Sequence, residues 1–213
     1  MNCCYQHYED RESWLAGRTG IGASEAAAVC GISKWQTPIG LWELKTGRKK
    51  AKDMSKNESV AFGVRAEPHL RGLFMAEHPQ YELDYRAFDI LYQEDRPWLT
   101  ATLDGELVDK ATGECGILEI KTAQCSSKED WAVWKDRIPT HYYTQINHQF
   151  LATGAEFAYL FALLTGLDGN SSVRTYYFTA DDCADDMAWL LNKEEAFWKH
   201  VQDGTMPPAV LKL

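Results

Sequence analysis

Hydrophobic positions along the chain recur in a pattern that predicts a strand-rich middle bounded by helices. Three successive strands are expected at about residues 82 to 91, 98 to 108 and 115 to 122. Two more are expected from Phe157 to Leu164 and from Val173 to Phe178. Turn residues separate the second strand from the third, so these two are expected to form a hairpin.

Capping residues and helical spacing predict the other elements. The first expected helix is capped by Ser24 or the glycines before it and ends at Gly31, and the second begins at Thr37-Pro38 and ends at Gly47. The third starts with the capping box Ser55-Lys56-Asn57-Glu58. Three more helices are expected near residues 128 to 136, 140 to 153 and 181 to 202. The third carries Glu67 on the side of Val60, Val64 and Phe74, and Pro68 predicts a kink or local break there. This order of elements predicts an α/β sandwich with a mixed central sheet.

The hairpin brings two acidic residues together. If it is symmetric about Ala111 and Thr112, Asp104 lies opposite Glu119. Side chains two positions apart on a strand share a face, so Lys121 is expected beside Glu119. Opposed carboxylates repel one another unless a cation sits between them, and oxygen ligands favour magnesium or manganese.

Burial strengthens this interpretation of the hairpin. Leu118 and Ile120, on either side of Glu119, predict a largely buried strand, in which an unpaired acid is costly. The alternative is an ordinary turn and a solvated strand face, with Lys121 in a structural salt bridge to Glu119 or Asp104. The hairpin is therefore a candidate metal site.

Composition predicts one compact domain over residues 1–213. The chain has 45% hydrophobic residues and no linker-like stretch, enough to bury a sizeable core. The net charge of -9 is unevenly spread, because residues 1–72 carry eleven basic against eight acidic side chains. The basic run from Lys45 to Lys56 could contact phosphates non-specifically or form a solvated loop. A passive nucleic-acid coat protein, which would be basic throughout, is disfavoured.

Several other classes of site are not indicated. The six cysteines form no CxxC pair, which argues against a zinc ribbon or an iron-sulfur cluster and for reduced thiols. The histidines show no ligand spacing, and His148 is expected to be structural or on the surface. Trp35 could stack against a DNA end, with core packing the favoured alternative. No apolar run could span a bilayer and no secretory signal is present, so a cytoplasmic protein without membrane contact is expected.

Four motifs together resemble a known nuclease family. Asp104 followed by Glu119-Ile120-Lys121 resembles the PD-(D/E)xK nuclease core, with Leu103 in place of its proline. Residues 14–25, 62–68 and 142–147 are similar to the N-terminal signature, the helical glutamate motif and the helical glutamine motif of the lambda-exonuclease-like, YqaJ-type viral recombinase nucleases. The motifs occur in the family's order and cover roughly residues 11 to 165.

The resemblance implies a fold and a division of the chain. The fold is an α/β restriction-endonuclease-like core, with a mixed central sheet flanked by helices. The single nuclease domain would comprise an N-terminal helical signature at 11–50, a catalytic core at about 57–180 and a C-terminal helix at about 181–202.

The resemblance also assigns roles to residues. Asp104, Glu119 and the Ile120 carbonyl would hold a metal ion, and Glu67 would supply an acid for a second. Lys121 would orient or deprotonate the attacking water and stabilise the phosphate charge, and Gln145 would bind the water or a phosphate. The DNA 5′-phosphate pocket would consist of Arg18, Ser24 and Thr102. The alternatives are surface positions for Glu67, Gln145 and Thr102 and an ordinary helix cap for Ser24.

The implied activity is exonucleolytic. The protein would digest one strand of linear double-stranded DNA from its 5′ end with two Mg²⁺ or Mn²⁺ ions, leaving a 3′ single-stranded tail. It would be a viral or prophage homotrimer that works with a single-strand annealing protein in the bacterial cytoplasm. Alternatives are an endonuclease or repair nuclease on the same core, or a DNA-end-binding module with a vestigial metal site. Retention of all five residues Glu67, Asp104, Glu119, Lys121 and Gln145 argues against the last.

Overall fold

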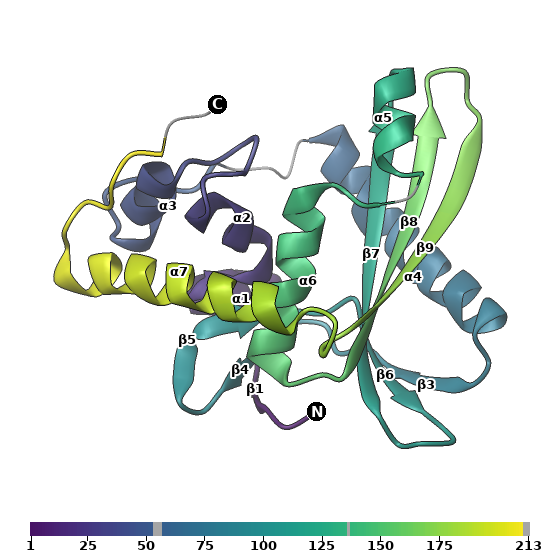
Figure 1. The fold of residues 1–213 in the computed structure, drawn as a ribbon, viewed down its shortest axis with the longest axis horizontal. Coiled ribbons are helices and arrows are strands. Elements are labelled where there is room, and N and C mark those ends of the chain that lie inside the picture. The colour runs from purple at the N-terminus through teal and green to yellow at the C-terminus, as the bar shows by residue number, and fades with distance from the viewer. Residues whose placement is uncertain (53–56, 136, 211–213) are drawn as a thin grey trace.

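The fold contains two β-sheets with helices packed around them (Figure 1). The computed structural model describes residues 1–52, 57–135 and 137–210. The larger sheet has the strand order β3-β6-β7-β8-β9 and consists of Tyr81–Asp84, Gly105–Asp109, Cys115–Cys125, Phe157–Gly166 and Ser171–Thr179. Strands β7 and β8 run parallel, and the other neighbours are antiparallel. The predicted α/β fold with a mixed central sheet is confirmed.

The predicted hairpin register is also confirmed. Strands β6 and β7 pair antiparallel with Gly105 opposite Leu118 and Val108 opposite Cys115. This is the alignment of a hairpin that is symmetric about Ala111 and Thr112. Asp104 directly precedes β6, so it reaches the position across from Glu119 without belonging to the strand.

A second, smaller sheet was not predicted. It has the order β1-β4-β5-β2 and consists of Cys4–His7, Asp89–Gln93, Arg96–Ala101 and Ile21–Gly22. The strand predicted at 98 to 108 is wrong, because β5 ends at Ala101 and β6 begins at Gly105 in the other sheet. The strand predicted at 82 to 91 is likewise divided between β3 and β4. Apolar residues lie on both sides of each crossing, Leu83 and Ile90 in one stretch and Leu99 and Leu107 in the other, so the hydrophobic pattern does not reveal where the chain changes sheets.

The helices mostly follow the predicted positions. Their bounds are α1 Arg11–Gly17, α2 Ala26–Val29, α3 Pro38–Lys45, α4 Glu58–Glu77, α5 Lys128–Val133, α6 Thr140–Thr153 and α7 Ala184–Asp203, with a 3₁₀ turn η1 at Ala23–Glu25. The predicted α3 cap is confirmed, because the Thr37 side chain accepts a hydrogen bond from the Gly40 N–H. Ser24 lies inside η1 and caps neither η1 nor α2, which corrects one of the two alternatives for the first expected helix. The other alternative, a glycine, is found at the N-cap of η1, which is Gly22.

Helix α4 differs from its prediction in several respects. It continues through Pro68, so of the predicted kink or local break the break is wrong; Pro68 is exposed, and water can hydrate the carbonyl that the proline ring leaves unpaired. Val60 and Val64 are 43% and 66% exposed, so they are not on the packed face. The predicted capping box at Ser55 lies outside the described residues, and the Asn57 side chain caps the helix at the Val60 N–H.

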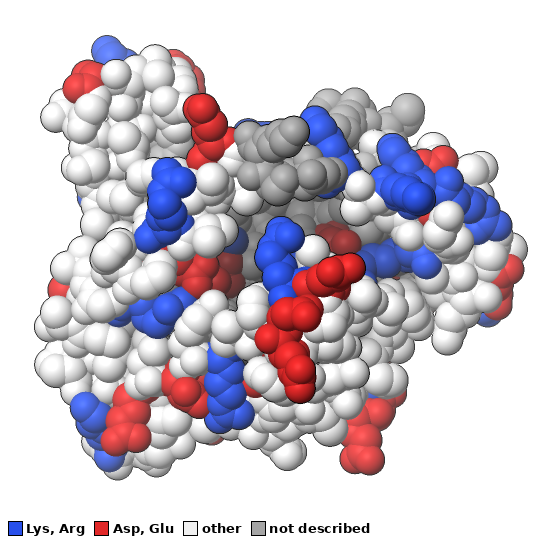
Figure 2. Space-filling model, turned by 180° about the vertical axis from the view of Figure 1, so that it is seen from behind, with Lys and Arg blue, Asp and Glu red and all other residues white. Residues whose placement is uncertain are grey.

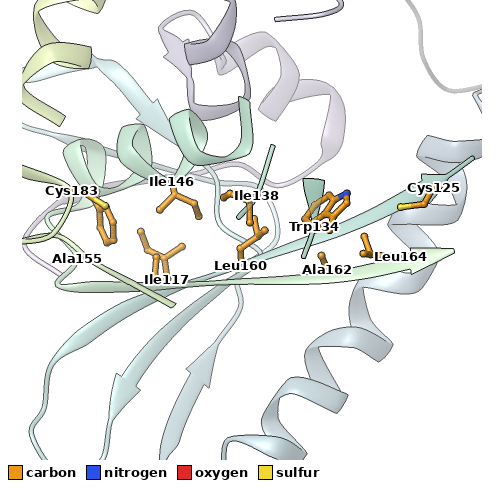
Figure 3. Packing of buried hydrophobic residues seen from close by; sticks show 12 residues of the cluster. Ile117, Cys125, Trp134, Ile138, Ile146, Ala155, Leu160, Ala162, Leu164 and Cys183 are labelled. Atoms are coloured by element: carbon orange, nitrogen blue, oxygen red, sulfur yellow. The ribbon is translucent and has the colours of Figure 1, made fainter. Parts of the chain in front are cut away.

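Successive residues of β7 pack alternately against helix α6 on one face of the sheet and helix α4 on the other. Ile117 belongs to a cluster with Ile146 of α6, and Figure 3 shows Leu160 of β8 in the same layer. Leu118 belongs to a different cluster with Phe74 of α4. Because side chains two apart share a face, the side chains at 119 and 121 point to the α6 side. This places the two predicted catalytic residues of β7 against α6.

A buried ion pair fastens α6 to α7 and the smaller sheet. His148 and Glu194 are both fully buried, and Nδ1 of the histidine lies 2.7 Å from Oε1 of the glutamate. Its Nε2 lies 2.9 Å from the Thr100 carbonyl of β5. A carbonyl and a carboxylate can only accept, so both ring nitrogens carry protons. Burial lowers the pKa of His148, and Glu194 and the two hydrogen bonds outweigh this effect and raise the pKa. The predicted structural role of His148 is confirmed.

The basic run is partly integrated into the structure. Lys45 forms an ion pair with Glu25 at 2.7 Å, and the Arg48 guanidinium lies 4.2 Å from the centre of the Trp42 ring. Figure 2 shows basic side chains over the α3 end of the face seen there, interspersed with acidic ones. Lys56 lies outside the described residues. None of the helices within the described ranges is both long and apolar enough to cross a bilayer.

Gly20, just before β2, is expected to tolerate no side chain. A Cβ there would lie 2.3 Å from the Trp98 carbonyl oxygen, a backbone atom that cannot rotate away. Gly20→Ala should therefore lower the free energy of unfolding by about 1–3 kcal/mol in urea denaturation. The matched control Gly72→Ala, within α4 and with open space around it, should raise it by about 0.5–1 kcal/mol. Equal effects of the two substitutions would contradict the close approach of β2 to β5.

Candidate active site

All the site residues predicted from the sequence line one cavity. Its volume is about 430 Å³, and it lies where β7, α4, α6, η1 and the crossing segment between the sheets meet. The predicted residues in its wall are Arg18, Ser24, Glu67, Thr102, Asp104, Glu119, Ile120, Lys121 and Gln145. The sequence motifs are spread over more than 100 positions, and the fold brings them to one place.

Asp104 is held at the open end of the hairpin. Its Oδ2 accepts a hydrogen bond of 2.7 Å from the Ile120 N–H. The pairing of β6 with β7 ends at Leu118, so the Ile120 N–H of β7 donates to the Asp104 carboxylate and not to a backbone carbonyl of β6. Because N–H and C=O of one strand residue point to the same neighbour, the Ile120 carbonyl is expected on the Asp104 side.

Glu119 is 3% exposed and receives donors on both oxygens. Oε1 accepts from Gln145 Nε2 at 2.7 Å and lies 2.5 Å from Lys121 Nζ. Oε2 accepts from Gln149 Nε2 at 2.5 Å. The salt bridge between Lys121 and Glu119, stated above as the alternative to a catalytic role, is thus present in the structure. Both of its residues line the candidate active site.

Burial and neighbouring charges change the pKa values of Asp104 and Lys121. Burial, followed by the nearby Glu119, raises the pKa of Asp104 well above its usual range, and Lys121 acts in the opposite direction. Burial lowers the pKa of Lys121, but Glu119 and Asp104 outweigh it and raise the pKa to about 12. Lys121 is therefore protonated at neutral pH, which suits charge stabilisation rather than removal of a proton.

Glu67 lies on α4 and is paired with a residue that the sequence motifs did not single out. Arg71 Nη2 lies 2.5 Å from Glu67 Oε1, and Arg71 Nε donates to the Asp104 carbonyl at 2.6 Å. The pKa of Glu67 is raised above its ordinary value, because the effect of burial, to which the charge of Glu119 adds, is larger than the opposing effect of Arg71. Arg71 therefore ties the Glu67 helix to the Asp104 segment.

Arg18, Ser24 and Thr102 meet beside these acids. The three also line a narrow recess of about 40 Å³, together with Gln145. The Arg18 guanidinium lies 4.8 Å from the centre of the Trp14 ring and forms no salt bridge with any described residue. A cation without a protein counter-ion, next to two hydroxyl groups, suits an anionic group of a ligand.

Two of the acids each keep one oxygen available to a hard divalent cation. Asp104 Oδ1 and Glu67 Oε2 accept no hydrogen bond from the described part of the chain, so each acid is fixed through one oxygen and keeps the other available. The described residues contain no cluster of three or more His, Cys, Asp or Glu arranged around a metal position. Glu119 is satisfied by protein donors, so cation binding would replace some of these contacts.

Sequence reasoning missed Arg71 and Gln149. Each lies four residues after a predicted site residue on the same helix, Glu67 and Gln145 respectively. Residues four apart share a helix face, and this spacing was the available signal. Gln149 is fully buried, and its contact with Glu119 makes it part of the support of the acid.

The fold is shared with a solved exonuclease. The structure resembles an alkaline exonuclease, LHK-Exo, from Laribacter hongkongensis, with a TM-score of 0.64 and 16% identity over 91% of this chain and 94% of that one. The structure of LHK-Exo in complex with dAMP matches with a TM-score of 0.65 and 17% identity over the same shares. At this identity the likeness shows the fold alone.

Sequence comparison gives the family. The chain is 31% identical over 203 residues to YqaJ of Bacillus subtilis (strain 168), an uncharacterized protein, and the match covers 94% of this chain and 59% of that relative. This chain thus spans about three fifths of the length of YqaJ. Residues 13–156 match the family model of the YqaJ-like viral recombinase domain. The protein belongs to the YqaJ-like viral recombinase domain family, as the ordered motifs around Asp104 and Glu119 had predicted.

Proposed function

We propose that the protein is a metal-dependent exodeoxyribonuclease that digests linear double-stranded DNA from the 5′ end and leaves 3′ single-stranded tails. Family membership and the exonuclease fold support a nuclease. The observation that carries the finer proposal is the single cavity that joins the Glu67–Asp104–Glu119–Lys121 group to Arg18, Ser24 and Thr102. The neighbour LHK-Exo was solved with dAMP, a nucleoside monophosphate of the kind that an exonuclease releases.

The acids would hold the cations. Asp104, Glu119 and the Ile120 carbonyl supply oxygen ligands for one Mg²⁺ or Mn²⁺ ion, and Glu67 supplies an acid for a second. When bound, such cations activate water and neutralise the charge of the scissile phosphate. Protonated Lys121 adds a positive charge beside that phosphate. Gln145 cannot accept a proton as a base, so its role is to donate a hydrogen bond that orients Glu119 or the water.

A preference for phosphorylated 5′ ends would follow from the recess around Arg18. Loss of a charge-assisted contact near 1.5–3 kcal/mol slows digestion by on the order of tenfold or more. We expect a 5′-phosphorylated duplex to be digested that much faster than a 5′-hydroxyl duplex, and Arg18→Ala to remove most of the difference. Arg11→Ala, at an exposed position outside the cavity, is the matched control and should keep the preference. If the native protein digested 5′-phosphorylated and 5′-hydroxyl duplexes at equal initial rates, the recess would not be the binding site of the terminal phosphate.

Polarity and end-dependence can be tested in one assay. Linear duplexes labelled at either end and a covalently closed circle are incubated with magnesium, with manganese and with EDTA. We expect early release of the 5′ label from the linear substrate, an intact circle and no reaction in EDTA. Cleavage of the circle would instead indicate an endonuclease on the same core, and early release of the 3′ label would indicate the opposite polarity.

Assembly and partner are proposals that rest on the family resemblance. We propose a homotrimer around the duplex and cooperation with a single-strand annealing protein, since the tails that the exonuclease leaves are substrates for annealing. Light scattering of the purified protein tests the trimer. A monomer at micromolar concentration, with undiminished digestion of long duplexes, would contradict it.

A further inference from the structure

Three aromatic rings form a continuous strip that leads from Lys121 to the surface. The Lys121 ammonium lies 5.2 Å from the centre of the Tyr142 ring, and Tyr142 lies 4.1 Å from His141. His141 meets the edge of Trp35 at 5.1 Å between ring centres, with the rings at 85°. We call Tyr142, His141 and Trp35 the aromatic strip. It joins the start of α6 to the loop between α2 and α3.

Trp35 is the outer end of the strip. It is 73% exposed, so the expected packing in the core is wrong. Apart from the contact with His141, the described part of the chain leaves most of this indole in water, where its apolar surface gains no stabilisation from burial. A flat apolar face is therefore available to a ligand at this position.

The strip lines a second cavity that continues the candidate active site. This cavity of about 560 Å³ has Trp35, His141 and Tyr142 in its wall, and Thr122 of β7 lines both cavities. A ligand bound across Lys121 can thus extend along the strip without leaving the protein surface. The aromatic strip therefore adjoins the cavity that is proposed to hold the scissile phosphate.

The wall of the second cavity carries one charged side chain of each sign and a neutral histidine. Lys34, exposed next to Trp35, contributes an ammonium to the wall. Asp130 contributes the opposing carboxylate, and its Oδ2 is occupied by the N–H groups of Ser126 and Ser127. Burial, Lys34 and Lys121 lower the pKa of His141 to about 4, so its ring is neutral at physiological pH and can stack without a charge.

We propose that the aromatic strip binds the unpaired bases of DNA next to the scissile phosphate, by stacking that does not depend on base identity. The proposal rests on the proposed nuclease function and extends the site to single-stranded nucleotides. Every base has a π face, so aromatic side chains beside a cationic groove bind single strands of any sequence. Trp35 provides the outermost stacking surface, and His141 and Tyr142 continue it toward Lys121.

Binding in EDTA tests the strip without any cleavage. The probe is a fluorescent oligothymidine of about ten nucleotides, titrated with native protein, Trp35→Ala, Trp35→Phe and the control Trp189→Ala. Trp189 is 53% exposed on α7 and lines neither cavity. We expect Trp35→Ala to weaken binding about tenfold, Trp35→Phe to retain most of the affinity and Trp189→Ala to match the native protein. An abasic oligonucleotide of the same length should bind native protein and Trp35→Ala equally.

The outcomes separate the strip from the nuclease proposal. Equal oligothymidine affinity of native protein and Trp35→Ala overturns the strip, and would leave an apolar protein partner as the ligand of Trp35. Equal weakening of oligothymidine and abasic binding also overturns it, because base stacking would not be involved. Magnesium-dependent digestion of linear duplex is measured in parallel, and its absence would contradict the nuclease function without changing the binding result.

Discussion

Asp104→Asn is expected to abolish DNA cleavage while the protein remains folded. Asparagine keeps an oxygen that can accept the Ile120 N–H, so the end of the hairpin retains its local structure. It removes the charge that would bind a cation opposite Glu119. Because a catalytic cation contributes several kcal/mol of charge stabilisation, the rate of nucleotide release from linear duplex should fall by on the order of 10³-fold.

The same substitution should not destabilise the protein without divalent cations. Burial and the charges of Glu119 and Glu67 disfavour ionisation of Asp104, and asparagine avoids both the buried charge and the repulsion. Thermal unfolding in EDTA should therefore give a midpoint for Asp104→Asn that is at least as high as that of the native protein. Glu82→Gln, at an exposed position of β3, is the control and should change neither cleavage nor unfolding. If Asp104→Asn unfolded at a much lower temperature than the native protein, its loss of cleavage could be caused by unfolding, and the stability prediction would be contradicted.

Glu119 requires a different expectation, because it is surrounded by donors. Alanine at this position would leave the buried amides of Gln145 and Gln149, and the partly buried Lys121, without their acceptor. Unpaired buried donors are costly, so loss of the Glu119 carboxylate should destabilise the protein. For two isolated opposed acids, removal of either one would relieve repulsion. Here only removal of the Asp104 charge is expected to have this effect. The amide partners explain how Glu119 remains buried in the absence of a cation.

Removal of Glu194 is expected to be the most destabilising single change outside the cavity. Glu194→Ala leaves a buried His148 without its counter-ion, and a broken buried pair costs about 3–5 kcal/mol. The free energy of unfolding, measured in urea near pH 6, should fall by that amount. Glu195→Ala, one residue further on the exposed face of α7, should change it by less than about 0.5 kcal/mol.

The pair also predicts a dependence on pH. The pKa of His148 is raised in the folded state, so the contribution of the pair is complete below the unfolded value near 6.5 and is lost as pH rises through the folded pKa. The difference in stability between native protein and Glu194→Gln should accordingly shrink toward alkaline pH. A difference that grows with pH would show that His148 is neutral in the folded protein.

The local chemistry of the hairpin could be predicted from the sequence because it depends on short-range rules. Turn residues fixed the symmetry around Ala111 and Thr112, and strand alternation then placed Asp104 opposite Glu119 with Lys121 on the same face. Apolar neighbours of Glu119 correctly indicated that its strand is buried on both sides. These inferences require no knowledge of distant parts of the chain.

Features that depend on distant contacts could not be predicted in this way. The crossing between sheets at Thr102–Asp104 is hidden because Ala101 and Gly105 are both buried, so the apolar pattern continues through it. Exposure of Trp35 depends on which segments cover its loop, and local spacing does not contain that information. The Glu119 contacts of Gln149 became evident only once α6 was placed on the same face of β7.

The most direct test of the central claim is nucleotide release from a linear, 5′-phosphorylated duplex by native protein and by Asp104→Asn, side by side with magnesium and with EDTA. We expect rapid release by the native protein with magnesium, none in EDTA and a loss of about 10³-fold in the variant. Release by Asp104→Asn at the native rate, with the variant folded, would contradict the assignment of this cavity as the active site.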